Sequence, residues 1–187
     1  LIGCSCDVCT SDDPRDRRDR PGAMVEYPDG DRTARFLIDT TPELRQQMIR
    51  HGVSEIQGVV YTHAHADHVL GIDDLRRFNA VMDRPIDIYS EPYVLDRLRE
   101  AFRYIFEPHR NVNTSFIPQL ITHEITAGVG FDLHGQTWTP IRLMHGRLPI
   151  VGYRIGGFAY CTDCSGIPPE TWPVLRDLKA LARGVPR

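Results

Sequence analysis

The stretch VVYTHAHADHVLGIDDLR, residues 59–76, places three histidines and an aspartate within six residues. These residues are His63, His65, Asp67 and His68, in a chain that has only eight histidines. The apolar residues before them predict a short strand that ends near Thr62. His63 and His65 are two positions apart, so they project to the same side if the chain stays extended.

The four side chains of this motif favour a metal site over an exposed polar loop. Imidazole and carboxylate together suit Zn, Fe or Mn, and the small alanines between them leave room for the ligands to converge. One ion takes about four to six ligands, so Asp67 and His68 are available to a second ion beside the first. A solvated loop in which Asp67 caps the following helix is the alternative, and it explains one histidine better than three.

Further ligands are expected at the ends of two later β-type runs. His145 ends WTPIRLMH, residues 138–145, and Gly146 after it allows the backbone to turn. Asp163 follows FAYCT, residues 158–162, in the same way. Each would be an ordinary turn residue if it stood alone. Joined to the histidine motif, they become candidate ligands, and Asp163 can bridge two ions because a carboxylate has two oxygens.

The composition indicates a soluble globular chain. It has 187 residues, of which 41% are hydrophobic and 25% charged, which suits one domain with its own core. We expect a single domain over 1–187 that lacks residues at both termini, because the chain opens on Leu1 and stops just after an expected helix. The net charge of −3 does not favour nucleic acid, and no run of eighteen apolar residues predicts a membrane span. We expect a cytoplasmic location, and a homodimer stays open.

The patterns along the chain predict a mixed α/β architecture with a strand-rich second half. AMVEYP and RFLID on either side of DGDR predict a hairpin, and the polar residues 10–22 predict a loop. Helices are expected over 41–52, 69–82, 92–105 and 168–182. Strands are expected over 86–90, 119–125, 130–134, 138–145, 151–156 and 158–162.

Two cysteine motifs call for separate interpretations. Cys4, Cys6 and Cys9 form C-x-C-x-x-C, and three thiolates this close favour tetrahedral Zn with a fourth ligand still needed. Reduced structural cysteines in a loop are the alternative. Cys161 and Cys164 form C-x-x-C, but Cys161 lies in an apolar run, so we expect it to pack as a small hydrophobic side chain.

H-A-H-A-D-H, with a later strand-end histidine and aspartate, resembles the metallo-β-lactamase superfamily, whose H-x-H-x-D-H signature it matches in full. The resemblance implies an α/β (α+β) fold, an αββα sandwich with a two-metal site along one edge. It assigns His63, His65 and His145 to one metal and Asp67 and His68 to the other, with Asp163 bridging. The family pattern has one more histidine late in the chain, and no residue after Asp163 is a histidine here.

GCSCDVC and the arginine-rich RDRRDRPGAMVE narrow the resemblance to a phosphodiesterase branch, typified by the phosphoribosyl cyclic phosphate phosphodiesterases. YTHAHADHVLGIDDLR, RIGGFAYCTDCSGIP and the MHG strand end match as well, so the resemblance covers most of the chain. This branch carries a structural zinc on the three cysteines. Coenzyme PQQ biosynthesis proteins of B type are also similar, and tRNA 3′-processing ribonucleases more distantly so.

The resemblance implies a metal-dependent hydrolase, a phosphodiesterase for small cyclic ribose or nucleotide phosphodiesters. Two Zn or Mn ions would activate a hydroxide, and Asp67 would orient it as well as bind metal. Arg18, Arg20 and His109 are weaker candidates for substrate contact, since an arginine near the metals can bind a phosphate bidentately. The alternatives are a thioester or lactam hydrolase, a PQQ-type oxidative role, and a non-catalytic metal-binding protein.

Overall fold

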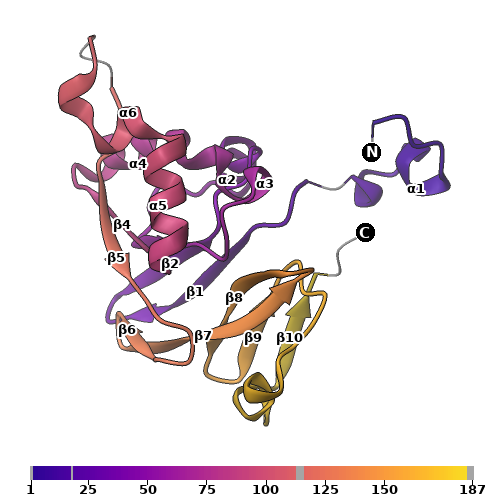
Figure 1. The fold of residues 1–187 in the computed structure, drawn as a ribbon. Helices are drawn as coiled ribbons and strands as arrows, with labels where there is room; N and C mark the ends of the chain where they lie inside the picture. Colours follow the sequence, from indigo (N-terminus) through magenta and orange to yellow (C-terminus); the bar gives the residue numbers. More distant parts are fainter. Residues whose placement is uncertain (1, 18, 113–115, 185–187) are drawn as a thin grey trace.

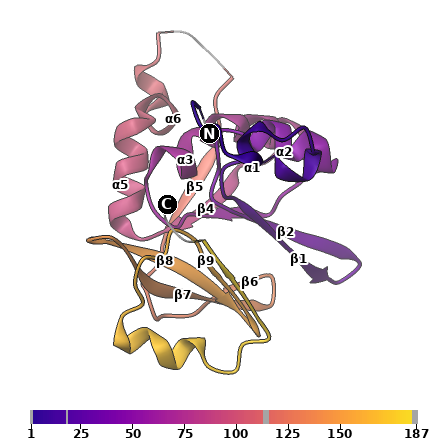
Figure 2. The same cartoon turned by 90° about the vertical axis from the view of Figure 1, so that its right-hand side faces the viewer.

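Two five-stranded sheets form the centre of the computed structural model, which describes residues 2–17, 19–112 and 116–184. Sheet A has the strand order β1-β2-β3-β4-β5, and sheet B has the order β10-β9-β8-β7-β6. The helices gather on the outer side of sheet A, and sheet B lies on its other side (Figures 1 and 2). This arrangement agrees with the mixed α/β sandwich that the sequence predicted.

Sheet A begins with the predicted hairpin and continues in parallel. The antiparallel pairing of β1 and β2 runs from Ala23↔Ile38 to Asp29↔Arg32, and β2 to β5 are parallel neighbours. The strands are β1 (Ala23–Asp29), β2 (Arg32–Ile38), β3 (Gly58–Val60), β4 (Ile86–Ser90) and β5 (Leu120–Glu124). Because parallel strands end at one edge, the residues that follow β2 and β3 lie side by side there.

The helical segments lie between the strands of sheet A. They are α2 (Leu44–His51), α3 (Ala66–Val69), η2 (Leu70–Asp74), α4 (Leu75–Met82), α5 (Pro92–Ala101), α6 (Arg103–Phe106) and η3 (Pro108–Arg110). Gly52 ends α2 in the left-handed conformation, at φ 64°, as predicted. The expected helix over 69–82 begins as 3₁₀ and becomes α-helical at Leu75. No helix in the described part of the chain is long and apolar enough to cross a bilayer.

Alternation along β2 divides the core into two layers. Leu37 faces the helices and packs with residues of α4 and α5. Its neighbours Phe36 and Ile38 face sheet B, where Trp138 and Tyr153 meet them. Successive side chains of a strand point to opposite faces, so a β2 that is buried on both sides holds the two layers together.

Sheet B brings two chain segments to one edge. Its strands are β6 (Phe131–Leu133), β7 (Gln136–His145), β8 (Leu148–Ile155), β9 (Phe158–Cys161) and β10 (Ala180–Arg183). β8 is antiparallel to both β7 and β9, so β7 and β9 run in the same direction. His145 at the end of β7 and Asp163 just after β9 are therefore at the same edge.

The predicted helix over 168–182 is wrong. The chain forms a 3₁₀ helix, η4 (Pro169–Leu175), and then β10, which pairs in parallel with β9 from Ala180↔Phe158 to Arg183↔Cys161. Pro169 and Pro173 lack the N–H donors that an α-helix needs. Val174 and Leu175 pack against the outer face of sheet B, so the apolar spacing reflects burial without an α-helix.

The N-terminal segment projects away from the sheets (Figures 1 and 2). It contains the four-residue helix α1 (Asp7–Thr10) and the 3₁₀ turn η1 (Pro14–Asp16). The predicted loop over 10–22 therefore includes one short helical turn. The three N-terminal cysteines lie in this segment, which keeps them on a separate extension of the fold.

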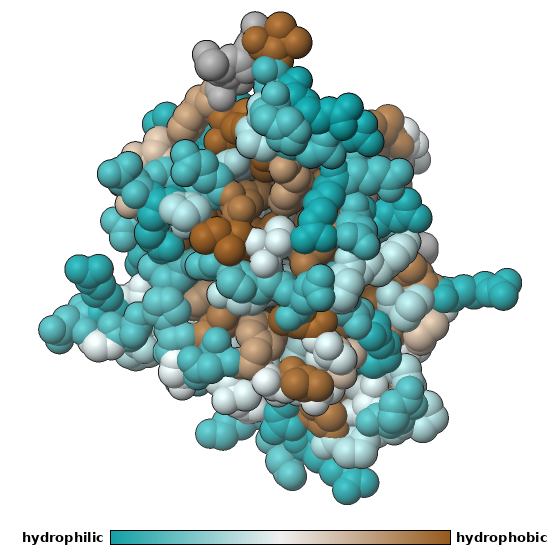
Figure 3. Space-filling model, turned by 60° about the vertical axis from the view of Figure 1, so that its left-hand side comes forward, coloured by the Kyte–Doolittle hydropathy of each residue, from teal (hydrophilic) through white to brown (hydrophobic). Residues whose placement is uncertain are grey.

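An apolar cavity of about 490 Å³ lies beside α6. Ile105 and Phe106 line it together with Phe116, Ile117 and Leu120. Figure 3 looks toward this side of the molecule, where apolar side chains appear between polar ones. None of the predicted metal ligands lines this cavity.

Candidate metal centre

The predicted histidines converge where the edges of the two sheets meet. His63 and His65 follow β3 in the chain, while His145 comes from the end of β7. One ligand atom from each of these three residues lies within 4.8 Å of those of the other two. A second group with the same spacing consists of His63, His68 and Asp163. His63 belongs to both groups, so the two candidate metal positions are adjacent.

The cluster has a buried floor and an open side. His63 and His68 are buried, and their ring centroids are 4.2 Å apart. His65 is exposed, with its ring centroid 5.1 Å from that of His145. A bound molecule can therefore approach from the His65 side, while the protein fixes the opposite side.

Hydrogen bonding fixes the orientation of the His63 ring. Nδ1 of His63 lies 2.9 Å from Oγ1 of Thr62, and that hydroxyl donates to Asp39 Oδ2 at 2.8 Å. The Thr62 oxygen therefore accepts from the Nδ1–H of His63. The ring is left with a bare Nε2, the form in which imidazole binds a metal.

Asp39 also holds His68. Its Oδ2 accepts from Nδ1 of His68 at 2.7 Å, and its Oδ1 accepts from the backbone N–H of Thr62 at 2.8 Å. The other ring nitrogen of His68, Nε2, lies 2.9 Å from Asp163 Oδ2. A carboxylate behind the histidine thus directs Nε2 toward the cluster, the usual arrangement behind a metal-binding histidine.

Burial and charge move the pKa values of these groups in different directions. Burial, then the charges of His68, His65 and His145, lower the pKa of His63 to about 3, so its ring is neutral. Burial also lowers the pKa of His68, but the hydrogen bond and charge of Asp39, with the charges of Asp163 and Asp67, outweigh it and raise the pKa to about 9. Burial raises the pKa of Asp39 against its hydrogen bonds from His68 and Thr62. The carboxylates around His68 therefore favour a positive charge at this point.

Two buried ring nitrogens fit a metal ion. Within the described residues, His63 Nε2 and His145 Nδ1 are buried and have no hydrogen-bond partner. Such atoms are costly in a protein interior unless something else binds them. Nitrogen and carboxylate donors of this kind suit Zn or Mn, so the donor set fits a divalent ion.

Asp67 lies at the open side and belongs to neither of the two close groups. Its Oδ2 is 3.7 Å from Nε2 of His68, and 47% of its side chain is exposed. Its expected role as a ligand with His68 stays a prediction. The exposure places its carboxylate where it can meet a bound molecule or water.

The three candidates for substrate contact are not gathered with the histidines. Arg20 forms an ion pair with Glu43, and Arg18 lies outside the described residues. His109 is exposed in η3, which follows α6. Any substrate contact by these residues stays a prediction.

Sequence reasoning missed Asp39, although a signal was present. Asp39 ends RFLID, just as His145 and Asp163 follow their own strand runs. It adopts a left-handed conformation at φ 65° and is 2% exposed. A polar residue directly after a buried strand, next to the strand that leads to His63, was the available clue.

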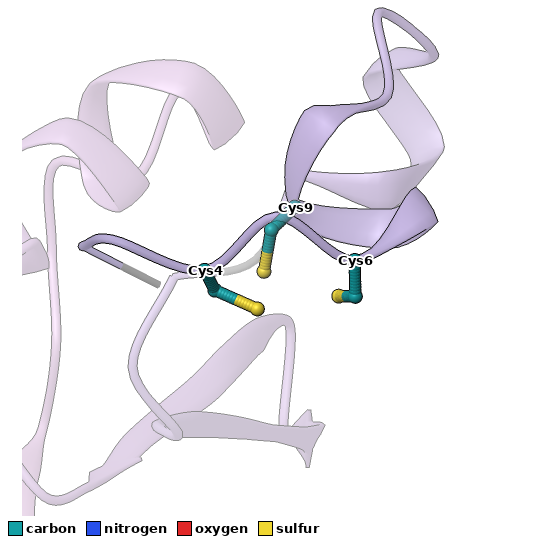
Figure 4. Close-up of side chains that lie close together, drawn as sticks. All are labelled: Cys4, Cys6 and Cys9. Carbon is teal, nitrogen blue, oxygen red and sulfur yellow. The ribbon is translucent and has the colours of Figure 1, made fainter.

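The three N-terminal cysteines lie close together. Their sulfur atoms lie within 4.8 Å of one another, and Figure 4 shows the side chains pointing toward a shared space. A hydrogen bond from the Cys9 backbone, with contributions from the Cys4 and Cys9 thiols, lowers the pKa of Cys6 to about 7. A thiolate is the form that binds zinc, so the geometry suits the predicted structural site, which still needs a fourth ligand.

Cys161 and Cys164 are both buried in the third core cluster. Burial, followed by the charge of Cys164, raises the pKa of Cys161 to about 11. None of the five cysteines forms a disulfide. Cys161 therefore packs as the small hydrophobic side chain that the sequence predicted.

Cys6→Ser is expected to lower the bound zinc by about one ion per chain, because a structural zinc site needs all its thiolates. Metal analysis of the purified protein measures this directly. Ser5→Ala is the matched control, since it changes the neighbouring residue and keeps all three thiols. An unchanged zinc content in Cys6→Ser would show that the cysteines do not hold zinc.

Comparison with known proteins identifies the family. The model of the "Beta-lactamase superfamily domain" family matches residues 34–182, which include every candidate ligand of the histidine cluster. The chain therefore belongs to this superfamily, and the predicted metallo-β-lactamase-like α/β fold is confirmed. The fold assigns it to a class of hydrolases and implies divalent metal binding.

Three known proteins place the chain within the superfamily. The crystal structure of a diphosphatase from the PhnP family is 39% identical, with a TM-score of 0.84 over 97% of this chain and 66% of that one. An octanoyltransferase of Porphyromonas gingivalis is 37% identical over 180 residues, which are 96% of this chain and 35% of that protein. Zn²⁺-bound PqqB from Methylobacterium extorquens is 20% identical and shares the fold, with a TM-score of 0.68 over 97% of this chain and 67% of that one. The chain spans about a third of the octanoyltransferase.

Proposed function

We propose that the chain is a metal-dependent phosphodiesterase that acts on small cyclic ribose or nucleotide phosphodiesters. The observation that carries the proposal is the pair of adjacent ligand groups that share His63. Adjacent metal positions are the arrangement that phosphatases and nucleases use to cleave phosphate esters. The likeness to a PhnP-family diphosphatase at 39% identity supports a phosphorylated substrate.

The side chains divide between two divalent ions, Zn or Mn. His63, His65 and His145 would hold one ion, and His68 and Asp67 the other, with Asp163 between them. When bound, such ions stabilise charge on phosphoryl oxygens and lower the pKa of bound water from 15.7 to about 7. The open side next to His65 and Asp67 would admit the phosphate group.

The residues of the chain supply orientation. Asp67 extends a half-exposed carboxylate toward the open side, where it can accept a proton from the attacking water and orient it in line with the leaving oxygen. Thr62 and Asp39 hold the rings of His63 and His68 at fixed angles. This fixed frame lets a phosphate group enter without rearrangement of the buried floor.

A diphosphate is the second candidate substrate, and the name of the PhnP-family neighbour favours it. Both candidates are attacked at phosphorus and need the same ligand set. A thioester or lactam hydrolase and a PQQ-type oxidative role are further from the proposal. The proposal includes a small phosphorylated substrate, a cytoplasmic location and no direct role for nucleic acid or membrane, and size-exclusion chromatography would test a homodimer.

The test is a substrate panel with purified protein that has been freed of metal and reloaded with Mn or Zn. The panel contains an aryl phosphodiester, a cyclic nucleotide, an organic diphosphate, a thioester and a lactam. We expect turnover of the phosphodiesters, with loss after a chelator and recovery after metal is added. Turnover of the diphosphate alone would favour the second candidate. No turnover of any phosphorus substrate with either metal contradicts the proposal.

A further inference from the structure

The candidate ligands come from two different sheets, so the distance between the sheets sets the geometry of the cluster. His63, His65 and His68 belong to the segment that follows β3 of sheet A. His145 and Asp163 belong to the ends of β7 and β9 in sheet B. Something must hold the two sets in register, because a metal site tolerates only small errors in ligand position.

β8 is the strand that makes this connection. It lies between β7 and β9 in sheet B, and it contacts the two residues that directly precede His63. The hydroxyl of Tyr153 donates to the carbonyl of Tyr61 at 2.7 Å, and the N–H of Val151 donates to the carbonyl of Thr62 at 3.2 Å. Two successive peptide groups before His63 are thus held by the strand that separates the two ligand-bearing strands of sheet B.

The Tyr61 carbonyl has a second donor that serves as an internal comparison. The Ser90 hydroxyl donates to the same oxygen at 3.0 Å, but Ser90 is the last residue of β4 and so belongs to sheet A. Tyr61, Ser90 and Tyr153 are all fully buried. The two bonds therefore share an acceptor and a burial state, and they differ in whether they join the sheets.

The geometry points to Tyr153 as a positioning residue that sets the separation between the sheet A and sheet B ligands of the metal centre. Its hydroxyl acts through the Tyr61 carbonyl on the backbone that leads to His63. It does not touch the cluster itself, and its ring packs in the core between the sheets with Trp138 and Phe36. The inference rests on the proposed metal centre and adds a residue that selects its geometry.

The prediction follows from removing one hydroxyl at a time. Tyr153→Phe keeps the ring and removes the bond between the sheets, so affinity for Zn at the histidines is expected to fall about 10-fold, at the low end for residues behind metal ligands. Ser90→Ala removes the bond within sheet A, so affinity should stay within about 2-fold of the wild type. Competition with a chromophoric chelator measures both affinities.

Two further measurements separate positioning from general loss of stability. Thermal unfolding of the metal-free proteins should show similar midpoints for Tyr153→Phe and Ser90→Ala, because each loses one buried hydrogen bond to the same oxygen. In the cobalt-loaded proteins, the visible d–d absorption of the histidine-bound ion should change only in Tyr153→Phe. Thiolate-bound cobalt is distinguished by its sulfur-to-metal charge-transfer absorption.

Equal losses of affinity in the two variants, or an unchanged cobalt spectrum in Tyr153→Phe, would overturn the inference and leave the metal centre in place. A wild-type protein that binds no divalent ion at the histidines would overturn the metal centre itself, and this inference with it. The readouts do not depend on turnover, so failure to find the substrate leaves the test intact.

Discussion

Asp67→Ala is expected to lower phosphodiester hydrolysis by about 10²–10⁴-fold, the range for loss of a group that handles the proton of a reacting water. The carboxylate is the half-exposed member of the cluster, and its Oδ2 lies 3.7 Å from His68 Nε2. Its removal leaves the hydrogen bonds of His63 and His68 unchanged, so the protein should remain folded. Initial rates on an aryl phosphodiester at saturating Mn measure the effect.

Asp96→Ala is the control for this variant. Asp96 is also an exposed aspartate, paired with Arg99 on α5, and its removal should leave the rate unchanged. Metal analysis of Asp67→Ala distinguishes loss of an ion from loss of proton handling, since the two metal positions take different ligands. A rate within a few-fold of the wild type at full metal content would exclude Asp67 from the reaction.

Asp39→Asn is expected to weaken metal binding by about 10–100-fold and to lower the free energy of unfolding by about 3–5 kcal/mol. The variant keeps the shape of the side chain, but it replaces one carboxylate oxygen by an N–H₂ donor. Asp39 accepts from the Thr62 backbone, the Thr62 hydroxyl and His68, so at least one of these donors loses its acceptor. Urea unfolding in the presence of a chelator and Zn titration measure the two effects separately.

Asp29→Asn supplies a matched aspartate–histidine pair at the surface. Asp29 Oδ2 lies 2.6 Å from His134 Nδ1, and both side chains are more than 40% exposed. An exposed pair contributes about 0–1 kcal/mol, so this control should change neither stability nor metal binding appreciably. If Asp39→Asn behaved like Asp29→Asn, Asp39 would have no role behind the cluster.

The histidine motif carried most of the site information, because its ligands are close in sequence and follow a short apolar strand. His145 and Asp163 were predictable only by their position after strands, since their proximity to His63 depends on how the two sheets pack. Asp39 obeys the same rule, but it stands far from the histidines in sequence and was missed. Its importance appears only when parallel pairing of β2 and β3 brings it beside Thr62.

The fold class was predictable from alternating strands and helices, while the C-terminal element was not. The spacing of apolar residues over 168–182 fits a helix, yet pairing with β9 makes 180–183 a strand. Such pairing is a tertiary effect that local propensity does not contain. The short 3₁₀ segments η2 and η4 were missed for a related reason, because their apolar residues follow the neighbouring packing.

The assembly of the cluster from both sheets has a consequence for folding. Asp39, His63, His145 and Asp163 come together only when β2, β3, β7 and β9 are all in place. Contacts between residues so distant in sequence form slowly, and a partly folded chain offers no complete ligand set. A divalent ion that binds only the finished fold stabilises it by mass action, so metal supply during synthesis would determine how much of the chain survives proteolysis.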